Sequence, residues 1–281
     1  MSFLRELGKT GVKISAIGLG CMENIKVLNR AIDIGCTFWD TADFYGSGAN
    51  EILLSKALEE RSEVFLCTKF AFSLGPNGEI SILGKPEYVR QACENSLKRL
   101  GDYIDLYYQS RVDPNTPIED TVDVLAELVK EGKIKYIGLS ECSAETLRLL
   151  EACRELGVTI VAYSPLGHGF LTPNDFRRSI PRFQGENFNK NLEIVHKFNE
   201  FASKKGVTAG QLCLAWVLAQ GDDFVTIPGT KKLKYLEENF EAGNIHLSPE
   251  EISEIRKIID SIEIFGGRYN EQLSIESKEK L

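Results

Sequence analysis

Short apolar runs alternate with longer amphipathic stretches along most of the chain. A short apolar run is typical of a buried strand, and an amphipathic stretch of a dozen or more residues is typical of a helix packed on a sheet. Repetition of this unit predicts parallel strands connected by helices. The predicted strands are Ala16–Leu19, Thr37–Asp40, Val64–Thr68, Ile104–Tyr108, Ile134–Leu139, Thr159–Tyr163 and Phe224–Ile227. The predicted helices are Ile25–Ile34, Asn50–Leu58, Pro86–Leu100, Pro117–Glu131, Ala144–Leu156, Asn189–Lys205, Ala209–Ala219, Leu233–Ala242 and Pro249–Ile262.

Two local signals are more specific than this alternation. Phe3–Leu7 and Val12–Ile14 are separated by Gly8-Lys9-Thr10-Gly11, and glycine at both ends of so short a connection predicts a β-hairpin. Ser248-Pro249-Glu250-Glu251 predicts a helix start, with a serine N-cap, proline at the first helical position and Glu251 placed to complete a capping box.

The number of predicted strands is one short of the eight in a closed (β/α)8 barrel of the TIM type. The shortfall lies between Leu139 and Thr159, where only one helix is predicted. Either a strand is hidden there, the barrel is unusual, or part of the natural chain is absent. Because the chain length of 281 is only somewhat above the roughly 250 residues of one such barrel, we expect residues 1–281 to form a single domain.

The composition indicates an ordinary globular protein with an acidic balance. Hydrophobic residues make up 43% of the chain, charged residues 26%, and the formal net charge is −8. A polyanion would be repelled on average, so we expect no nucleic-acid partner. Seven cysteines without a CxxC pair favour reduced thiols and a cytoplasmic location. Since no run approaches the ~18 apolar residues of a membrane span, we expect no membrane partner.

Two charged residues, Asp40 and Lys69, end neighbouring predicted strands, where parallel α/β folds bind ligands. Charges at such positions are costly unless paired, so an ion pair is expected. Tyr45, five residues after Asp40, can reach the same barrel mouth. A nearby ammonium would lower the pKa of its phenol from about 10 toward the working range of a general acid. The alternatives are a structural salt bridge at the mouth and a packing role for Tyr45.

Other common site motifs are absent from the sequence. Gly18-Leu19-Gly20-Cys21-Met22-Glu23 lacks the last glycine of a GxGxxG fingerprint, and neither a P-loop nor HExxH occurs. His168, His196 and His246 are far apart along the chain and suggest no ligand set, so no metal is expected.

Several segments together resemble the aldo-keto reductase family. They are GLGCM, FWDTADFYGSGANEILLSKAL, CTKF, YIDLYYQSRVDP, KIKYIGLSECS, AYSPLGHGFL and IPGTKKLKYLEEN, and they follow one another from about Leu4 to Ile262. The sequence looks closest to the branch containing fungal and plant pyridoxal- or aldehyde-type reductases and potassium-channel β subunits. This resemblance implies an α/β fold, a (β/α)8 TIM-type barrel with an N-terminal β-hairpin, which binds NADP(H) and reduces a small carbonyl substrate without a metal.

The resemblance also implies roles for individual residues. Tyr45 would donate a proton to the carbonyl oxygen as hydride arrives from the nicotinamide, and Asp40 and Lys69 would tune it. The implied cofactor contacts are Tyr163 and Ser140 at the nicotinamide, Ser164 and Leu166 at the pyrophosphate, Thr230 and Lys231 at the 2′-phosphate, and Glu238 and Asn239 at the adenine.

The residues of the implied phosphate site also have suitable chemistry. Gly229 permits close approach of the backbone, and Lys231 with Lys232 supplies local positive charge on an acidic protein. A solvated helix start is the alternative. Because cations at a helix N-terminus are unfavourable without an anion, we favour the phosphate.

Ser110, in YYQSRVDP, is the first departure from the family pattern, which usually has a histidine there. That histidine helps to hold and polarise the carbonyl. A serine hydroxyl can donate a hydrogen bond but cannot carry a positive charge. Natural variation, an engineered change and a cofactor-binding protein with little turnover all remain open, and we predict weakened chemistry with cofactor binding intact.

The second departure is length. After Ser143–Arg148 the family has a further strand bearing a glutamine that contacts the carboxamide, and about thirty residues, one βα unit, are missing here. A shorter deficit follows Met22. A seven-stranded barrel is the less favoured explanation, because open edges would expose unpaired backbone groups.

Two functions from different classes fit these observations. The first is an NADPH-dependent reductase of aldehydes or ketones, which the intact Asp40, Tyr45 and Lys69 favour. The second is a nucleotide-sensing partner subunit with little turnover, which Ser110 favours. A metal-dependent hydrolase lacks the necessary histidine and carboxylate clusters. The sequence does not determine the physiological substrate or the oligomeric state.

Overall fold

The computed structural model of the protein describes residues 3–21, 24–58, 63–75, 77–101, 104–140, 153–167 and 180–267. The strands are β1 (Leu4–Glu6), β2 (Lys13–Ser15), β3 (Leu19–Gly20), β4 (Phe38–Asp40), β5 (Phe65–Phe70), β6 (Phe72–Leu74), β7 (Ile80–Ile82), β8 (Leu106–Gln109), β9 (Tyr136–Leu139), β10 (Ile160–Tyr163) and β11 (Phe224–Ile227). The α-helices are α1 (Ile25–Asp33), α2 (Ala49–Leu58), α3 (Pro86–Leu100), α4 (Ile118–Lys130), α6 (Gly185–Lys205), α7 (Ala209–Leu218), α8 (Leu233–Glu241) and α9 (Pro249–Asp260). Short 3₁₀ helices are η1 (Tyr45–Gly48), η3 (Pro181–Phe183) and η4 (Ala242–Asn244).

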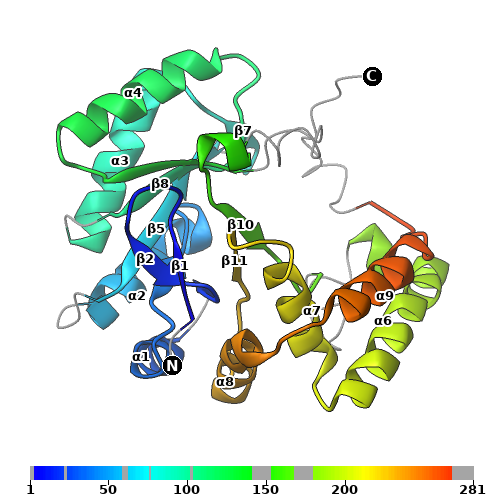
Figure 1. Cartoon of the computed structure of the whole chain (residues 1–281). Helices are drawn as coiled ribbons and strands as arrows, with labels where there is room; N and C mark the ends of the chain where they lie inside the picture. The colour runs from blue at the N-terminus through cyan, green and yellow to red at the C-terminus, as the bar shows by residue number, and fades with distance from the viewer. Residues whose placement is uncertain are drawn as a thin grey trace.

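The parallel strands lie in two sheets that one isolated bridge connects, and Figure 1 shows β5 and β8 of the first sheet and β10 and β11 of the second. Five of them pair in the order β3-β4-β5-β8-β9, and β10 pairs with β11. A bridge between Ile17, two residues before β3, and Thr226 joins this segment of the chain to β11. The series therefore runs from β9 through β3 and β11 to β10, as in a (β/α)8 barrel whose consecutive strands are neighbours.

The parallel α/β fold is as predicted, and the described residues contain seven parallel strands rather than eight. In this part of the chain β9 pairs only with β8, and β10 only with β11. Residues 141–152, which include most of the predicted helix Ala144–Leu156, lie outside the described ranges. None of the described helices is long and apolar enough to span a bilayer.

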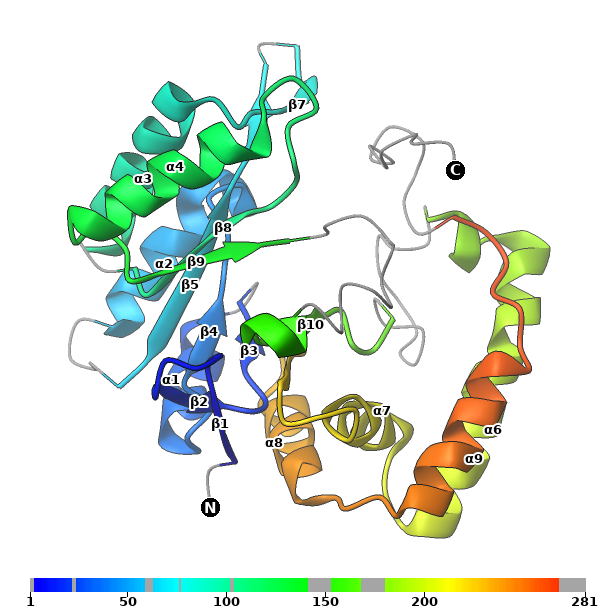
Figure 2. The same cartoon turned by 45° about the horizontal axis from the view of Figure 1, so that its top comes forward.

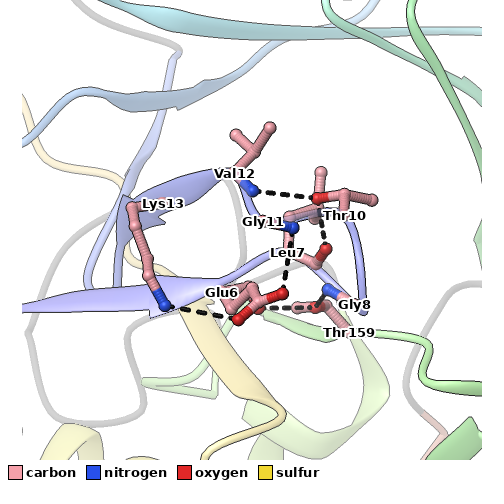
Figure 3. A network of polar contacts seen from close by, with 8 residues as sticks. All are labelled: Glu6, Leu7, Gly8, Thr10, Gly11, Val12, Lys13 and Thr159. Atoms are coloured by element: carbon pink, nitrogen blue, oxygen red, sulfur yellow. Dashed lines mark hydrogen bonds and ion pairs between the residues drawn. The ribbon is translucent and has the colours of Figure 1, made fainter.

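The N-terminal hairpin, β1 with β2, covers the end of the barrel where the strands begin. The Gly8 amide donates to Thr159 Oγ1 over 2.6 Å, just before β10 (Figure 3). Within the hairpin, the Glu6 carboxylate accepts the Gly11 amide at 2.9 Å and pairs with Lys13 at 3.3 Å (Figure 3). Gly8 has φ +56, and a Cβ there would lie 2.4 Å from the Gly157 carbonyl oxygen, so a glycine is needed. The hairpin leaves the opposite end, where the strands finish, for ligands.

Two apolar layers hold the barrel together. Helices α3 and α4 lie against the outer face of the five-stranded sheet (Figure 2), and the layer between is the largest buried cluster, with Trp39, Phe70 and Tyr107 among its members. A second cluster fills the barrel interior with side chains of alternate strand positions, including Phe38 and Tyr108. Because side chains alternate along a strand, the residues two positions after these ones also point into the barrel interior.

Most strands begin or end one or two residues away from their predicted bounds, and two differences from the sequence prediction are larger. The strand predicted at Ala16–Leu19 is β3 at Leu19–Gly20, because Ala16 still pairs with the N-terminal segment through the Phe3 carbonyl. The hairpin β6–β7 was not predicted. Its signal was Asn77-Gly78 between two short apolar runs, a sequence that favours a tight turn.

Candidate active site

At the end of the barrel opposite the hairpin, the alternation of the strands turns six residues toward the barrel interior. Asp40 is two residues after Phe38, and Ser110 is two residues after Tyr108, so both continue the interior face of their strands. The same spacing applies to Lys69 after Cys67, Ser140 after Gly138, and Gly229 after Ile227, while Tyr163 itself belongs to the interior cluster. The residues predicted at the mouth from the sequence are therefore brought to one end of the barrel.

Asp40 and Lys69 form a buried ion pair. The Lys69 ammonium donates to Asp40 Oδ1 and, over 2.7 Å, to the carbonyl oxygen of Thr41. The Lys69 side chain is only 13% exposed, and the Asp40 side chain only 4%. Burial lowers the pKa of Lys69, but the facing Asp40 carboxylate and Tyr45 outweigh it and raise that pKa above its usual value. Lys69 is therefore a permanent cation at neutral pH.

Tyr45 begins η1, directly after the loop that follows β4. Gly46 and Ser47 both have positive φ, 59° and 54°, a conformation that is unusual for serine and that turns the chain sharply at Tyr45. The Lys69 Nζ lies 5.7 Å from the centre of the Tyr45 ring. The structure thus places the phenol, the ammonium and the carboxylate within one cluster, as the sequence predicted.

The predicted direction of the Tyr45 pKa shift is wrong for the chain by itself. The Lys69 ammonium lowers the pKa of the phenol and is the largest single influence, with a smaller contribution from Arg111. Burial, the Asp40 carboxylate and Cys21 together outweigh it, so the pKa lies above its ordinary value. The sequence indicated the cation but not the depth of burial. A phenol with a raised pKa still carries its proton at neutral pH.

Ser110 lies directly after β8, and its amide donates to the Phe70 carbonyl at 2.8 Å. The residue is 4% exposed. Tyr108, which sequence reasoning missed, pairs with Lys69 in the β5–β8 register, and its ring centre is 5.6 Å from the ammonium. The signal for Tyr108 was its position two residues before Ser110, on the same face of the strand. Gly138 leaves space for the Tyr108 ring, since a Cβ at position 138 would lie 2.2 Å from that ring.

The residues predicted to contact the nicotinamide and pyrophosphate lie at the ends of β9 and β10. Ser140 is half-buried, with its amide donating to the Gln109 carbonyl at 2.9 Å. Tyr163 pairs with Ile227 across β10 and β11, and its ring packs on the interior cluster. Ser164 follows with φ 47°, a strained value for a serine. Leu166 packs against the cluster formed by α7 and residues 16–17.

The residues predicted to hold the 2′-phosphate surround the start of α8. Thr230 Oγ1 accepts the Lys232 amide at 3.2 Å, and Asn24 reaches the Lys231 carbonyl at 3.4 Å. Helix α8 has neither a side-chain cap nor an acidic residue in its first turn. A Cβ on Gly20 would lie 2.9 Å from the Ile227 carbonyl oxygen, so glycine allows β3 to approach the end of β11. An uncapped helix start with exposed lysines fits a bound phosphate.

Glu238 and Asn239, predicted at the adenine, lie on α8 one to two turns beyond these lysines. Asn239 is buried, and Glu238 is half-buried with Oε1 accepting the Thr208 hydroxyl at 2.8 Å. The structure therefore places Gly229, Thr230 and Lys231 directly before α8, which carries Glu238 and Asn239, and places Tyr163 on the strand beside β11.

Comparison with known proteins gives consistent matches over nearly the whole chain. The aldo/keto reductase family pattern matches residues 19–152 and 143–260. The aldo-keto reductase yakc [NADP(+)] of Schizosaccharomyces pombe is 45% identical, with 91% of this chain and 92% of that protein covered. Aldo-keto reductase str7 of Strobilurus tenacellus is 48% identical over 88% of this chain and 84% of its own length. Probable aldo-keto reductase 1 of Glycine max is 42% identical, covering 94% and 91%.

The match to the Schizosaccharomyces pombe protein extends over 311 positions, more than the 281 residues of this chain. The relative therefore has residues without a counterpart here, in agreement with the length deficit predicted from the sequence.

Solved structures show the same fold. The thermostable aldo-keto reductase Tm1743, solved with the inhibitor epalrestat, is 31% identical with a TM-score of 0.72, covering 91% of this chain and 99% of that one. The glycerol dehydrogenase of Gluconobacter oxydans has a TM-score of 0.81 at 23% identity, covering 92% and 95%. This chain belongs to the aldo/keto reductase family.

Proposed function

We propose that this protein is an NADP(H)-dependent oxidoreductase that reduces aldehydes or ketones to alcohols. Family membership and the NADP(+) in the name of the Schizosaccharomyces pombe relative support the reaction class and the cofactor. The observation that carries the proposal is the cluster at the barrel mouth, in which Tyr45 lies beside the buried pair of Lys69 and Asp40.

Tyr45 is the proton donor in this proposal. Its phenol holds the proton at neutral pH and would donate it to the carbonyl oxygen of the substrate. When bound, NADPH supplies the hydride for the carbonyl carbon. The Lys69 ammonium stabilises the phenolate left on Tyr45, and Asp40 holds Lys69 in position and balances its charge. Solvent then returns a proton to the phenolate.

The chain offers matching groups for the cofactor. Tyr163 presents a ring at the end of β10 for stacking on the nicotinamide, and Ser140 offers a hydroxyl for its carboxamide. Ser164 and Leu166 would lie along the pyrophosphate. Thr230 and Lys231, at the uncapped start of α8, would hold the 2′-phosphate, with Glu238 and Asn239 at the adenine. Charge-assisted hydrogen bonds from lysine favour a phosphate over a hydroxyl, and so NADP(H) over NAD(H).

Ser110 makes a second candidate function worth testing. A buried serine beside Tyr108 cannot place a positive charge near the carbonyl, so turnover is expected to be slow. A protein that binds NADPH and turns over rarely would act as a nucleotide sensor or partner subunit. The two functions differ in turnover, not in cofactor binding.

Two measurements separate these functions. NADPH binding is followed by cofactor fluorescence, and turnover is followed by NADPH oxidation with an aromatic aldehyde such as nitrobenzaldehyde. For the enzyme we expect turnover that falls at least about a hundredfold in Tyr45→Phe while NADPH still binds. Tyr136→Phe, at the opposite end of the barrel, is the matched control and should leave turnover unchanged. Tight NADPH binding without turnover would favour the sensor.

Substitution of Ser110 tests the reason for slow turnover. If the missing histidine limits the chemistry, Ser110→His should raise kcat, by roughly tenfold or more, with little change in NADPH affinity. Equal kcat in the two proteins would contradict this account of Ser110.

A further inference from the structure

Asp43 lies in the loop between β4 and η1, between Asp40 and Tyr45 in the sequence. Its amide donates to the Lys69 carbonyl oxygen over 3.0 Å. This hydrogen bond ties the Tyr45 loop to the segment of β5 that carries the ammonium. Displacement of Asp43 would consequently move Lys69 relative to Tyr45.

The Asp43 carboxyl is largely buried, and within the described part of the chain its Oδ1 has no hydrogen-bond partner. The carboxyl does accept the amide of Phe44. A buried carboxylate oxygen without a donor is unusual in a folded protein, because desolvation is then uncompensated. Its persistence beside a catalytic cluster suggests a role in the chemistry.

The surroundings of Asp43 leave its negative charge poorly balanced. Glu51, on α2, is fully buried and engages Arg99 Nε at 2.6 Å and the Thr68 hydroxyl at 2.7 Å. The two cations that act on the Asp43 carboxyl are thus already paired, Arg99 with Glu51 and Lys69 with Asp40. From other elements, Tyr88 on α3 and Tyr107 on β8 also interact electrostatically with Asp43, whose charge raises the pKa of both phenols.

Burial first, and then the like charge of Glu51, raise the pKa of Asp43 to about 7, against the smaller effects of Arg99, the Phe44 amide and Lys69. The charge on Asp43 therefore changes close to neutral pH.

We propose that Asp43 is a positioning residue of the proposed reduction: its amide holds the end of β5 that carries Lys69, and the charge on its carboxyl controls how strongly the Lys69 ammonium acts on Tyr45. This inference rests on the proposed function. When Asp43 is protonated, of these two carboxyls only Asp40 offsets the effect of the Lys69 charge on the phenol, and proton donation is easier. When Asp43 is ionised, it offsets part of the Lys69 charge and proton donation is harder.

The pH profile of kcat tests this role. For wild type, kcat for aldehyde reduction should fall roughly two- to fivefold as the pH rises through about 7. Asp43→Asn should lose this inflection and keep the low-pH value of kcat. Asp123→Asn, which removes an exposed carboxylate on α4, is the matched control and should keep the wild-type profile. If Asp43→Asn lowers kcat equally at every pH and keeps the inflection, Asp43 has only a structural role and the inference is overturned.

An NMR titration answers the same question without turnover. The ring Cζ resonance of Tyr45, in isotope-labelled protein, is assigned by its loss in Tyr45→Phe. It should shift with a midpoint near pH 7 in wild type and in Asp123→Asn, and not in Asp43→Asn. A flat resonance in wild type, or an inflection that survives Asp43→Asn, would overturn the inference. Absence of turnover in wild type would instead count against the proposed function, and the titration would still decide the role of Asp43.

Discussion

At the scale of single residues, the identity of the charged groups could be predicted but their environment could not. Asp40 and Lys69 were expected to pair because each ends an apolar strand, and they do. The pKa of Tyr45 depends on how deeply the ring is buried and on how close Asp40 lies, and neither can be derived from spacing. For the same reason Asp43, a residue within the recognised DTADFYG segment, attracted no prediction.

The Asp40–Lys69 pair should behave as a coupled unit in folding. Lys69→Met leaves Asp40 buried beside no cation, so we expect a loss of about 3 kcal/mol or more in the free energy of unfolding. The double variant Asp40→Asn with Lys69→Met removes both charges and should be less destabilised than the sum of the single variants, by roughly 1–3 kcal/mol. Urea unfolding of the four proteins at neutral pH measures this coupling, and strictly additive losses would contradict it.

Asp43 should make stability depend on pH in a direction opposite to that of an ion-paired carboxylate. Its pKa is about 7 in the folded chain and about 3.9 in the unfolded chain. Between these values the folded state binds more protons, so the free energy of unfolding decreases as pH rises from about 4 to about 7 and is level above. We expect Asp43→Asn to be more stable than wild type at pH 8, by about 4 kcal/mol, and nearly equal to it near pH 4. The same difference at both pH values would contradict the assignment.

At the scale of elements, helices with explicit start and stop signals were predicted well and short strands were not. Helix α3 spans Pro86–Leu100 as predicted, since proline occupies its start and Gly101, with φ 86°, ends it. The strands β6 and β7 are only three residues each, too short for a periodic pattern. Their hairpin nevertheless contributes Phe72, whose ring packs at a tilt against that of Phe44, directly before Tyr45, with 5.3 Å between the ring centres.

The capping box of α9 gives a quantitative test at this scale. The Ser248 hydroxyl accepts the Glu251 amide at 3.2 Å, and the Glu251 carboxylate accepts the Ser248 amide at 2.8 Å. Ser248→Ala removes the first of these hydrogen bonds and should lower the free energy of unfolding by about 1 kcal/mol. Ser253→Ala, at an exposed position inside the same helix, should have no such cost, since alanine is a good helix former. Equal effects of the two substitutions would contradict the capping role.

At the scale of the whole molecule, the pattern of alternating strands and helices predicted the parallel architecture, while the number of strands left a question. Each βα unit is marked by local sequence, so seven units could be located without knowledge of how they close. Closure of the barrel depends on contacts between β9 and β10. These strands are at opposite ends of the strand order, and no local sequence signal marks such contacts. The alignment with the Schizosaccharomyces pombe relative is longer than this chain, so that relative has residues without a counterpart here.

Amide hydrogen exchange should reveal whether the edge of β9 is open. The amides of Tyr136 and Ser140 donate toward β8, to the carbonyls of Asp105 and Gln109, so strand alternation points those of Ile137 and Leu139 away from it. Both side chains are also exposed, at 37% and 43%. With no described strand on that side, we expect these two amides to exchange roughly a hundredfold faster than the Thr68 amide in the centre of β5. Protection of Ile137 and Leu139 comparable to that of Thr68 would mean that another segment of the chain, or a second copy of it, pairs with this edge. Because a closed barrel has no such edge, the measurement distinguishes a seven-stranded open series from a barrel completed by a strand the sequence pattern did not reveal.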